Sequence, residues 1–368
     1  MHILIAPNTF KNSLAAPDVA NAIADGLKQS KLKFTCETFP VADGGDGTGD
    51  LVIQKLNGNV VPCEVHDPFG RKISSSFGLI ENGRTAVIEM ANASGLRLVN
   101  RSELNPMKAS SYGTGELMKY ALERNVTKII IGLGGSATVD GGCGILRALG
   151  VRFLDEDGNE LESLRNLSSI DSSALDERAL QCKIVVLCDV ENPLLGKNGA
   201  AAVFGPQKGA SATDVIELDR MLGKFAAIVG KNIATIKSGG AAGGVSAGLY
   251  GLLNAELVNG IEYFLQLTGF HKALQNANLV ITGEGSLDEQ TLSGKGPYGV
   301  AVEAKKKGIP VIGLAGQVPL IKSSEMQQYF DMLFSIGNGP GELEYAMKHT
   351  RENLARTAGE IGNLLATK

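Results

Sequence analysis

Residues Lys128–Gly144 read KIIIGLGGSATVDGGCG, an apolar run that ends in a loop rich in glycine. Both faces of the run are apolar and β-branched residues dominate it, which is typical of a buried strand in a parallel sheet. In open α/β sheets, ligands bind beyond the carboxyl ends of such strands, where bare backbone N–H groups can hold anions. We therefore predict an α/β fold with a ligand site at this loop.

Similar runs, each followed by a loop rich in glycine or acidic residues, are Ile3–Ala6, Ile184–Leu187, Leu279–Thr282 and Val311–Ala315. Between Val60 and Leu98 the pattern alternates apolar with polar residues and has a turn at Glu81–Arg84, which predicts antiparallel strands. Helices are expected at Pro17–Gln29, Gly49–Leu56, Gly113–Arg124, Thr213–Ile236, Gly243–Leu253, Gly260–Thr268 and Leu343–Leu365.

The antiparallel stretch interrupts the doubly wound pattern, so we expect two α/β domains with the second inserted into the first. The first would be a doubly wound, flavodoxin- or Rossmann-like parallel-sheet domain formed by residues 1–59, 104–148 and 271–368. The inserted mixed α/β domain would comprise residues 60–103 and 149–270. An insertion of this kind predicts a cleft between the domains.

Composition narrows the class of protein. The chain has 368 residues, 43% of them hydrophobic, and its 35 Lys+Arg against 39 Asp+Glu give a net charge of -4. This balance argues against a partner such as nucleic acid or an anionic membrane. No apolar stretch approaches the roughly 20 residues that span a bilayer, and the N-terminus lacks the features of a signal peptide. The five cysteines form no C-x-x-C pair, so we expect reduced thiols and a cytoplasmic location.

The common nucleotide fingerprints give a mixed answer. No G-x-x-x-x-G-K-[ST] motif occurs, which excludes a P-loop. Gly132–Ala137, GLGGSA, matches the dinucleotide fingerprint, and Asp155 lies near the spacing of a ribose-binding acid. A nicotinamide-linked dehydrogenase therefore stays open. The loop continues as TVDGG instead of entering an apolar helix, and Ser136, Thr138 and Asp140 suit polar ligands or phosphate.

The sequence lacks the patterns that are typical of a zinc site or of a serine hydrolase. The histidines are far apart without metal-ligand spacing, and no G-x-S-x-G occurs. Acidic residues, by contrast, follow several strands: they are Asp43, Asp46, Asp189, Glu284 and Asp288, the last two in the segment that follows Gly283. Phosphoryl transfer needs such acids to hold Mg²⁺ and to accept the proton of the attacking hydroxyl. Capping of the next helix is the alternative use of each acid.

Basic residues complete the set. Lys11 lies in NTFKNSL after the first strand, Lys295 in SGKGP, and Lys208 in FGPQKG. A cation beside glycine-exposed amides can hold a transferring phosphoryl group, although each lysine could also be a solvated residue at a helix start. Arg71, in DPFGR, could bind a substrate carboxylate through two parallel hydrogen bonds, or it could serve only as a turn residue.

Taken in order, the motifs resemble the class I bacterial glycerate kinases (glycerate 2-kinase) over nearly the whole chain. The matching segments are APNTFKNSLAAPDVANAIADG, PVADGGDGT, SYGTGELM, GLGGSATVDGG, CDVENPLLGKNGAAAVFGPQKGA, GGAAGGV and LVITGEGSLDEQTLSGKGPYGVA. The resemblance implies ATP-dependent phosphorylation of D-glycerate with Mg²⁺, giving 2-phosphoglycerate, in a cleft between two α/β domains. Asn8 stands where the family more often has Asp, and Asp46 where Glu is common.

Together these observations predict a kinase site. We expect Asp189 to be the base, Lys11 and Lys295 to be catalytic, and Glu284 and Asp288 to hold the metal. Substrate or phosphate binding is expected of Asp43, Asp46, Arg71, Gly134, Gly135, Ser136, Thr138, Asp140, Lys208 and Gly283. A kinase of another small hydroxy acid, a dehydrogenase and a non-catalytic anion-binding protein remain alternatives, and both a monomer and a homodimer stay open.

Overall fold

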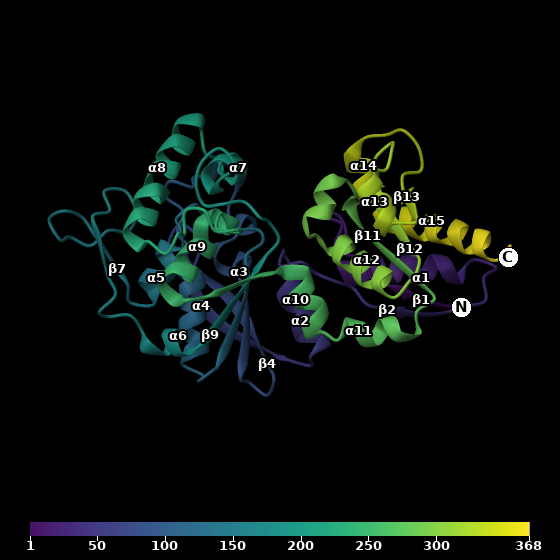
Figure 1. The fold of residues 1–368 in the computed structure, drawn as a ribbon, viewed down its shortest axis with the longest axis horizontal. Coiled ribbons are helices and arrows are strands. Elements are labelled where there is room, and N and C mark those ends of the chain that lie inside the picture. The colour runs from purple at the N-terminus through teal and green to yellow at the C-terminus, as the bar shows by residue number, and fades with distance from the viewer. Residues whose placement is uncertain (368) are drawn as a thin grey trace. The chain divides into compact units, whose positions relative to one another are not determined.

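The computed structural model describes residues 1–367, apart from the side chains of Gln290 and Ser293. The chain divides into two compact units, each with its own sheet (Figure 1). Unit 1 comprises Met1–Asp43 and Ile261–Lys368, and unit 2 comprises Gly44–Gly260. Unit 2 is thus an insertion in unit 1, as the interrupted strand pattern indicates.

Unit 1 contains a five-stranded parallel sheet in the order β13-β12-β11-β1-β2. The strands are β1 (His2–Ile5), β2 (Thr35–Thr38), β11 (Leu279–Ser286), β12 (Val311–Gln317) and β13 (Met332–Ser335). The helices are α1 (Ala16–Lys28), α10 (Gly260–Leu267), α11 (Phe270–Ala273), α12 (Gly296–Lys306), α13 (Ser324–Tyr329), α14 (Leu343–Lys348) and α15 (Thr350–Leu365).

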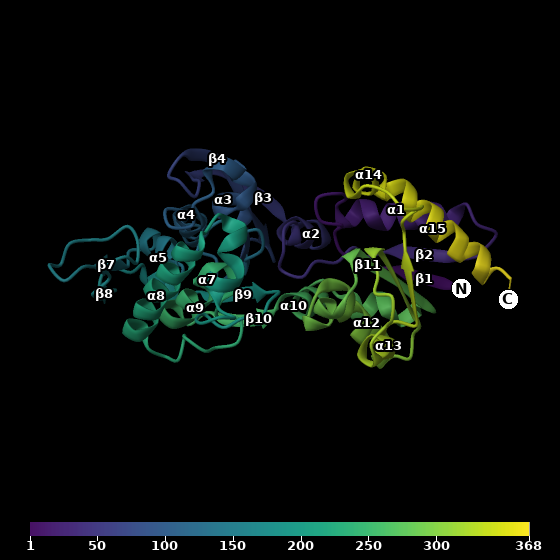
Figure 2. The same ribbon diagram turned by 90° about the horizontal axis from the view of Figure 1, so that it is seen from above.

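Helices cover both faces of this sheet (Figure 2). On one face, Ile3 and Ile5 of β1 pack with apolar side chains of α1 and α15, such as Ile23 and Leu354. Helices α12 and α13 lie on the other side of the sheet. Because both faces are covered, the central strands β1, β11 and β12 contain continuous apolar runs, whereas the edge strand β2 reads TCET and is mostly exposed.

Unit 2 contains a six-stranded mixed sheet in the order β10-β9-β6-β5-β4-β3. The strands are β3 (Asn59–His66), β4 (Lys72–Ile80), β5 (Thr85–Glu89), β6 (Lys128–Gly132), β9 (Lys183–Cys188) and β10 (Glu256–Asn259). The pairs β3–β4 and β4–β5 are antiparallel, whereas β5–β6, β6–β9 and β9–β10 are parallel. A small separate sheet joins β7 (Arg152–Leu154) to β8 (Ser169–Asp171).

The helices of unit 2 are α2 (Thr48–Lys55), α3 (Ala91–Ser94), α4 (Tyr112–Leu122), α5 (Cys143–Ala148), α6 (Glu177–Gln181), α7 (Ala200–Phe204), α8 (Ala212–Val229) and α9 (Ala241–Leu253). Side chains of α4, α5, α8 and α9 form one large core with the sheet, including Leu117, Ile145, Phe225 and Leu249. Among residues 1–367, no helix combines the length and the apolar character that crossing a membrane requires.

The division of the chain differs from the one expected. We expected residues 44–59 and 104–148 to join the termini, but they lie in unit 2. The reason is strand β6, which pairs with β5 and β9 and not with any strand of unit 1. A buried parallel strand has the same apolar pattern in either sheet, so its sequence does not identify its partners.

Two helices end earlier than expected. Helix α8 stops at Val229, before Gly230 with φ 70°. The helix expected at Leu343–Leu365 is broken at His349 into α14 and α15. At this break the Ser13 hydroxyl donates to Met347 O at 2.6 Å, so a side chain from another segment satisfies a carbonyl at the end of α14.

Candidate active site

In unit 1, polar side chains gather where β1 and β2 end. Asn8 and Asp43 are 5% and 9% exposed, and Asn8 Nδ2 donates to Asp43 Oδ2 at 2.9 Å. The backbone N–H of Gly296, at the start of α12, donates to the same oxygen at 3.2 Å. The backbone ladder continues past β1, because Asn8 N donates to Gly283 O at 2.8 Å. Asp43 is therefore held by the loop after β1 and by the start of α12.

Glu284 is the buried acid of this cluster, with 7% of its surface exposed. Its Oε1 accepts a hydrogen bond from Thr291 Oγ1 at 3.1 Å. Burial raises the pKa of Glu284 to about 7, and the charge of Asp43 adds to the rise, while Lys295, the Thr291 hydroxyl and Lys11 oppose it. A carboxyl group with a pKa near neutrality can exchange a proton under working conditions.

The lysines and the second acid lie around Glu284. Lys295 is half-buried at the N-cap of α12, and Lys11 is exposed in the loop after β1. Asp288 is half-buried, and its backbone N–H donates to Thr291 Oγ1 at 3.1 Å, so Thr291 connects the two acidic residues. The structure thus brings together Lys11, Asp43, Gly283, Glu284, Asp288 and Lys295 in unit 1.

Gly283 has a packing role at this edge. Its Cα faces the backbone of Leu314 on β12 so closely that any side chain would collide with the Leu314 carbonyl. The residue therefore lets β11 and β12 approach each other just before Glu284, and its carbonyl receives Asn8 N–H.

A Mg²⁺ ion fits this donor set only together with a phosphate ligand. Among residues 1–367, no group of three or more His, Cys, Asp or Glu residues could hold a metal. Mg²⁺ in kinases is held by one or two carboxylates plus substrate phosphates and water, so two acids suffice. Burial is the main cause of the raised pKa of Glu284, and the charge of Asp43 adds to it, so a bound cation would favour the ionised form of this carboxyl group.

In unit 2, the glycine loop lies between β6 and α5; we use this name for residues 132–144. Gly134 N donates to Gly44 O at 3.0 Å, and a side chain at Gly134 would collide with the backbone of Gly45. Gly135 has φ 70° and faces the side chain of Asp46, which is itself exposed. The glycines therefore serve a close backbone approach between two loops.

Lys208 lies against this loop. It is 2% exposed, and its Nζ donates to Ser136 Oγ at 2.8 Å and to Thr138 O at 2.7 Å. Burial lowers the pKa of Lys208 to about 7, and the charge of Asp140 opposes the shift. The phosphate contact expected of Lys208 would require the surrounding loops to open.

Thr138 has an unusual feature. Its side chain is fully buried, and of the residues that the structure describes, only Thr138 Oγ1 and Arg147 Nε are buried polar side-chain atoms without a hydrogen-bond partner. An unsatisfied buried hydroxyl costs about 1–3 kcal/mol. Such a group is a candidate for contact with a ligand or an ordered water.

Asp140 organises the loop itself. Its carboxylate accepts from Ser111 N at 2.9 Å, Ser111 Oγ at 2.7 Å, Gly142 N at 3.1 Å and Gly144 N at 3.1 Å. It therefore connects the start of α4 with the start of α5. These bonds favour the capping role over direct binding of a substrate.

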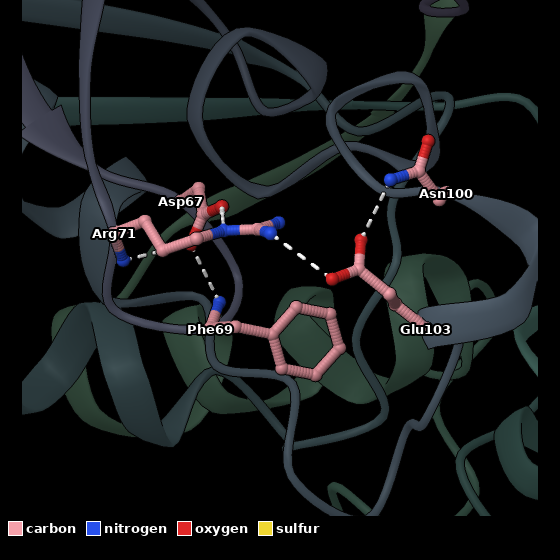
Figure 3. A network of polar contacts seen from close by, with 5 residues as sticks. All are labelled: Asp67, Phe69, Arg71, Asn100 and Glu103. Atoms are coloured by element: carbon pink, nitrogen blue, oxygen red, sulfur yellow. Dashed lines mark hydrogen bonds and ion pairs between the residues drawn. The ribbon is translucent and has the colours of Figure 1, made fainter.

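Asp189 and Arg71 also lie in unit 2. Asp189 follows β9 and is half-buried; its charge adds to the burial that raises the pKa of the neighbouring Cys188 to about 12. Arg71 Nε donates to Asp67 Oδ2 at 2.5 Å, and Arg71 Nη1 donates to Glu103 Oε1 at 3.2 Å (Figure 3). Although burial opposes it, hydrogen bonds from Arg71 lower the pKa of Asp67. A substrate carboxylate would have to compete with these two acids for Arg71.

The geometry of the glycine loop does not favour dinucleotide binding. That fingerprint needs a helix directly after the strand, whereas α5 begins only at Cys143 and Ala137 N donates to Ser94 O at 2.9 Å within the loop. Asp155 lies in a turn after β7, in the separate small sheet, where its Oδ1 accepts from Asn159 N at 2.8 Å.

Sequence reasoning missed some buried polar residues. Glu89 ends β5, is 6% exposed, and accepts a hydrogen bond from Gly49 N at 2.5 Å; burial raises its pKa. A glutamate directly after the apolar run TAVI was the available signal. The Asn8–Asp43 pair had no signal of this kind, because the two residues are 35 positions apart in the sequence. Thr291 is close in sequence to its partners Glu284 and Asp288, but no local pattern marked it.

Comparison with known proteins gives a consistent result. The sequence profile of the glycerate kinase family matches residues 3–366. Glycerate kinase from Bacillus subtilis is 44% identical, over 98% of this chain and 97% of its own. Glycerate 2-kinase from Escherichia coli is 43% identical, over 100% of this chain and 98% of its own. The crystal structure of a provisionally assigned glycerate kinase 2 from Salmonella typhimurium LT2 has a TM-score of 0.83 and 42% identity, covering 100% of this chain and 98% of that one.

The fold and the site thus define a two-unit α/β enzyme with acids and lysines at the carboxyl edge of a parallel sheet. The chain belongs to the glycerate kinase family, whose members are kinases with an alcohol group as phosphate acceptor.

Proposed function

We propose that this protein transfers the γ-phosphoryl group of ATP to D-glycerate in the cytoplasm, giving 2-phosphoglycerate and ADP. The observation that carries the proposal is the cluster in unit 1, where buried Glu284 lies within electrostatic reach of buried Asp43 and of Lys11 and Lys295. Phosphoryl transfer uses acidic and lysine side chains, and the carboxyl edge of a parallel sheet is where such ligand-binding groups gather. The near full-length similarity to glycerate kinases supports the choice of substrate.

Within this proposal, Glu284 and Asp288 hold Mg²⁺, which neutralises charge on the phosphates when bound, and Lys11 and Lys295 hold phosphate oxygens. A hydroxyl oxygen of glycerate attacks the γ-phosphorus, the bond from that phosphorus to the ADP oxygen breaks, and Asp189 accepts the hydroxyl proton. Contact with substrate oxygens is assigned to Asp43, Asp46, Arg71, Gly134, Gly135, Ser136 and Thr138, whereas Asp140 keeps the capping role that its hydrogen bonds give it. Mg-ATP in an interdomain cleft stays a prediction.

The test is a coupled assay with ATP, Mg²⁺, D-glycerate and enolase, without phosphoglycerate mutase. Signal under these conditions identifies 2-phosphoglycerate, whereas signal only after addition of the mutase identifies the 3-isomer and corrects the product. A parallel panel of small hydroxy acids, read by ADP release, identifies another preferred substrate. Binding of glycerate without ADP release would show that the protein binds small anions and is not a kinase.

Variants then test the roles. Asp189→Asn should abolish turnover while leaving ATP binding nearly intact, and activity within a few-fold of wild type would remove Asp189 as the base. Lys11→Ala and Lys295→Ala should weaken phosphate binding or transfer. Unchanged kinetics in both would leave the two lysines as surface residues.

A further inference from the structure

Lys208 is a buried lysine that reaches across a long stretch of the chain. It lies in the one-turn 3₁₀ helix η3 (Pro206–Lys208), while its acceptors Ser136 and Thr138 are 72 and 70 positions earlier. The residue is 2% exposed, and its ammonium group already donates to these two loop acceptors, at 2.8 Å and 2.7 Å. Lys208 therefore acts on the glycine loop and not on solvent.

The backbone of the glycine loop has other attachments on either side of this contact. Ala137 N donates to Ser94 O at 2.9 Å, and Gly141 N donates to Gly243 O at 3.0 Å. Between these two points, the Thr138 carbonyl accepts a hydrogen bond from Lys208 Nζ at 2.7 Å. Loss of the ammonium group would therefore release the middle of the loop while leaving its ends attached.

Thr138 is the residue on which this contact acts. Lys208 holds its carbonyl, and its own hydroxyl is buried without a partner. A hydroxyl whose backbone is fixed has a limited set of directions, which is what a binding group for a small substrate needs. Burying an ammonium group costs free energy, because the charge loses its contact with water. If the loop only needed packing, an apolar side chain at position 208 would support it without this desolvation cost.

We propose that Lys208 is a positioning residue, which holds Ser136 and Thr138 so that the Thr138 hydroxyl can receive an oxygen of the substrate. This inference rests on the proposed function and changes the role of Lys208 from phosphate contact to support of the loop. Thr138 is the residue that touches the substrate in this scheme, and Lys208 acts through it.

The first test compares Lys208→Met, which keeps the length of the side chain without its charge, with Lys224→Met on the exposed face of α8. Misplacement of a substrate-contacting group by about 1 Å costs on the order of 100-fold in rate. We expect Lys208→Met to lower kcat/KM for glycerate about 100-fold, with the Kd for ATP within about threefold, because the loop and not the phosphates is affected. Lys224→Met should match wild type.

The second test shows whether Lys208 acts through the Thr138 hydroxyl. Thr138→Val removes the hydroxyl and Thr138→Ser keeps it, so the first should lose glycerate turnover and the second should retain it. The double variant Lys208→Met/Thr138→Val should be no worse than the poorer single variant, since both changes act on one group. Multiplying losses would mean independent roles and would overturn the inference, as would an equal loss of ATP and glycerate binding in Lys208→Met.

A third measurement does not depend on turnover. Amide hydrogen exchange within residues 134–140 should be faster in Lys208→Met than in wild type, and unchanged in Lys224→Met. If the wild type fails to phosphorylate glycerate but this exchange difference is present, the proposed function is wrong, whereas the support of the loop by Lys208 is confirmed. Unchanged exchange overturns the inference. Ser136→Ala, which leaves Lys208 in place, repeats the exchange test if Lys208→Met does not fold.

Discussion

The side-chain amide of Asn8 donates a hydrogen bond of 2.9 Å to the carboxylate of Asp43, joining the loop after β1 to the end of the segment after β2. Both residues are buried, and Asp43 Oδ2 has Gly296 N–H as a second donor. The neutral amide at position 8 gives Asp43 a donor without adding a further acid beside Glu284.

Replacement of Asn8 by alanine should destabilise the protein. Removing one partner of a buried charged acceptor costs about 1–3 kcal/mol, so the free energy of unfolding of Asn8→Ala should fall by about that amount. Urea denaturation measures the change, and Asn198→Ala, at an exposed position, is the matched control. A loss no larger than that of the control would show that the Asn8–Asp43 contact contributes little.

Glu284 should make stability depend on pH. Its pKa is 4.5 in the unfolded chain and about 7 in the folded protein, so between these values the folded state binds more protons. The contribution of Glu284 is fully present below pH 4.5 and is lost as the pH rises through 7, with a change of about 3 kcal/mol. Glu284→Gln should remove this part of the slope in urea denaturation between pH 4.5 and 8. Exposed Glu289→Gln should leave it unchanged, and an identical slope in Glu284→Gln would contradict the assignment.

Lys208 should give a slope of the opposite sign at higher pH. Its pKa is 10.5 when unfolded and about 7 when folded, so between pH 7 and 10.5 the unfolded chain binds more protons. The free energy of unfolding should therefore rise with pH in this window, by about 5 kcal/mol from this group. Lys208→Met should flatten the rise, measured by denaturation at pH 7, 8.5 and 10, while Lys224→Met keeps it. Equal slopes in both variants would show that the buried amine does not titrate there.

Gly283 should not tolerate a side chain. Alanine at this position would collide with the Leu314 carbonyl of the neighbouring strand, and overpacking costs about 1–3 kcal/mol or more. We expect Gly283→Ala to lower the thermal midpoint and to disturb Glu284, with loss of activity. Gly341→Ala, where nothing lies within 4 Å of the added carbon, is the control and should change stability by less than about 0.5 kcal/mol. If Gly283→Ala is as stable and active as the control, the close approach of β11 and β12 at Gly283 is not needed for the site.

Much of the fold could be predicted from the sequence. The runs Ile3–Ala6 and Leu279–Thr282 lie on β1 and β11, and the turn at Glu81–Arg84 joins the antiparallel strands β4 and β5. These elements are defined by local patterns of apolar residues and turn residues, which a single sequence contains. The pairing of β6 with β5 and β9 depends on contacts between distant segments and could not be predicted in this way.

The candidate site was predicted in part for the same reason. Acids and lysines after strands were visible, and Asp43, Glu284 and Lys295 do lie within electrostatic reach of one another. Burial was not visible: Lys208 was expected to bind substrate or phosphate, but its ammonium is held by Ser136 and Thr138. Of the two carboxylates that bind Arg71, Glu103 was equally hidden, because it is 32 positions away in the sequence.

The sheet of unit 1 has a consequence for biosynthesis. Strand β1 pairs with β11, and α1 packs with α15, so the N-terminal segment leaves the ribosome long before its partners exist. Unit 2, which is continuous from Gly44 to Gly260, is complete in the meantime. At about 5–20 residues per second, the wait lasts on the order of tens of seconds. We expect chains stalled on the ribosome within α12, when residues up to Gly260 have emerged, to show protease resistance in unit 2 while Met1–Asp43 is still cleaved.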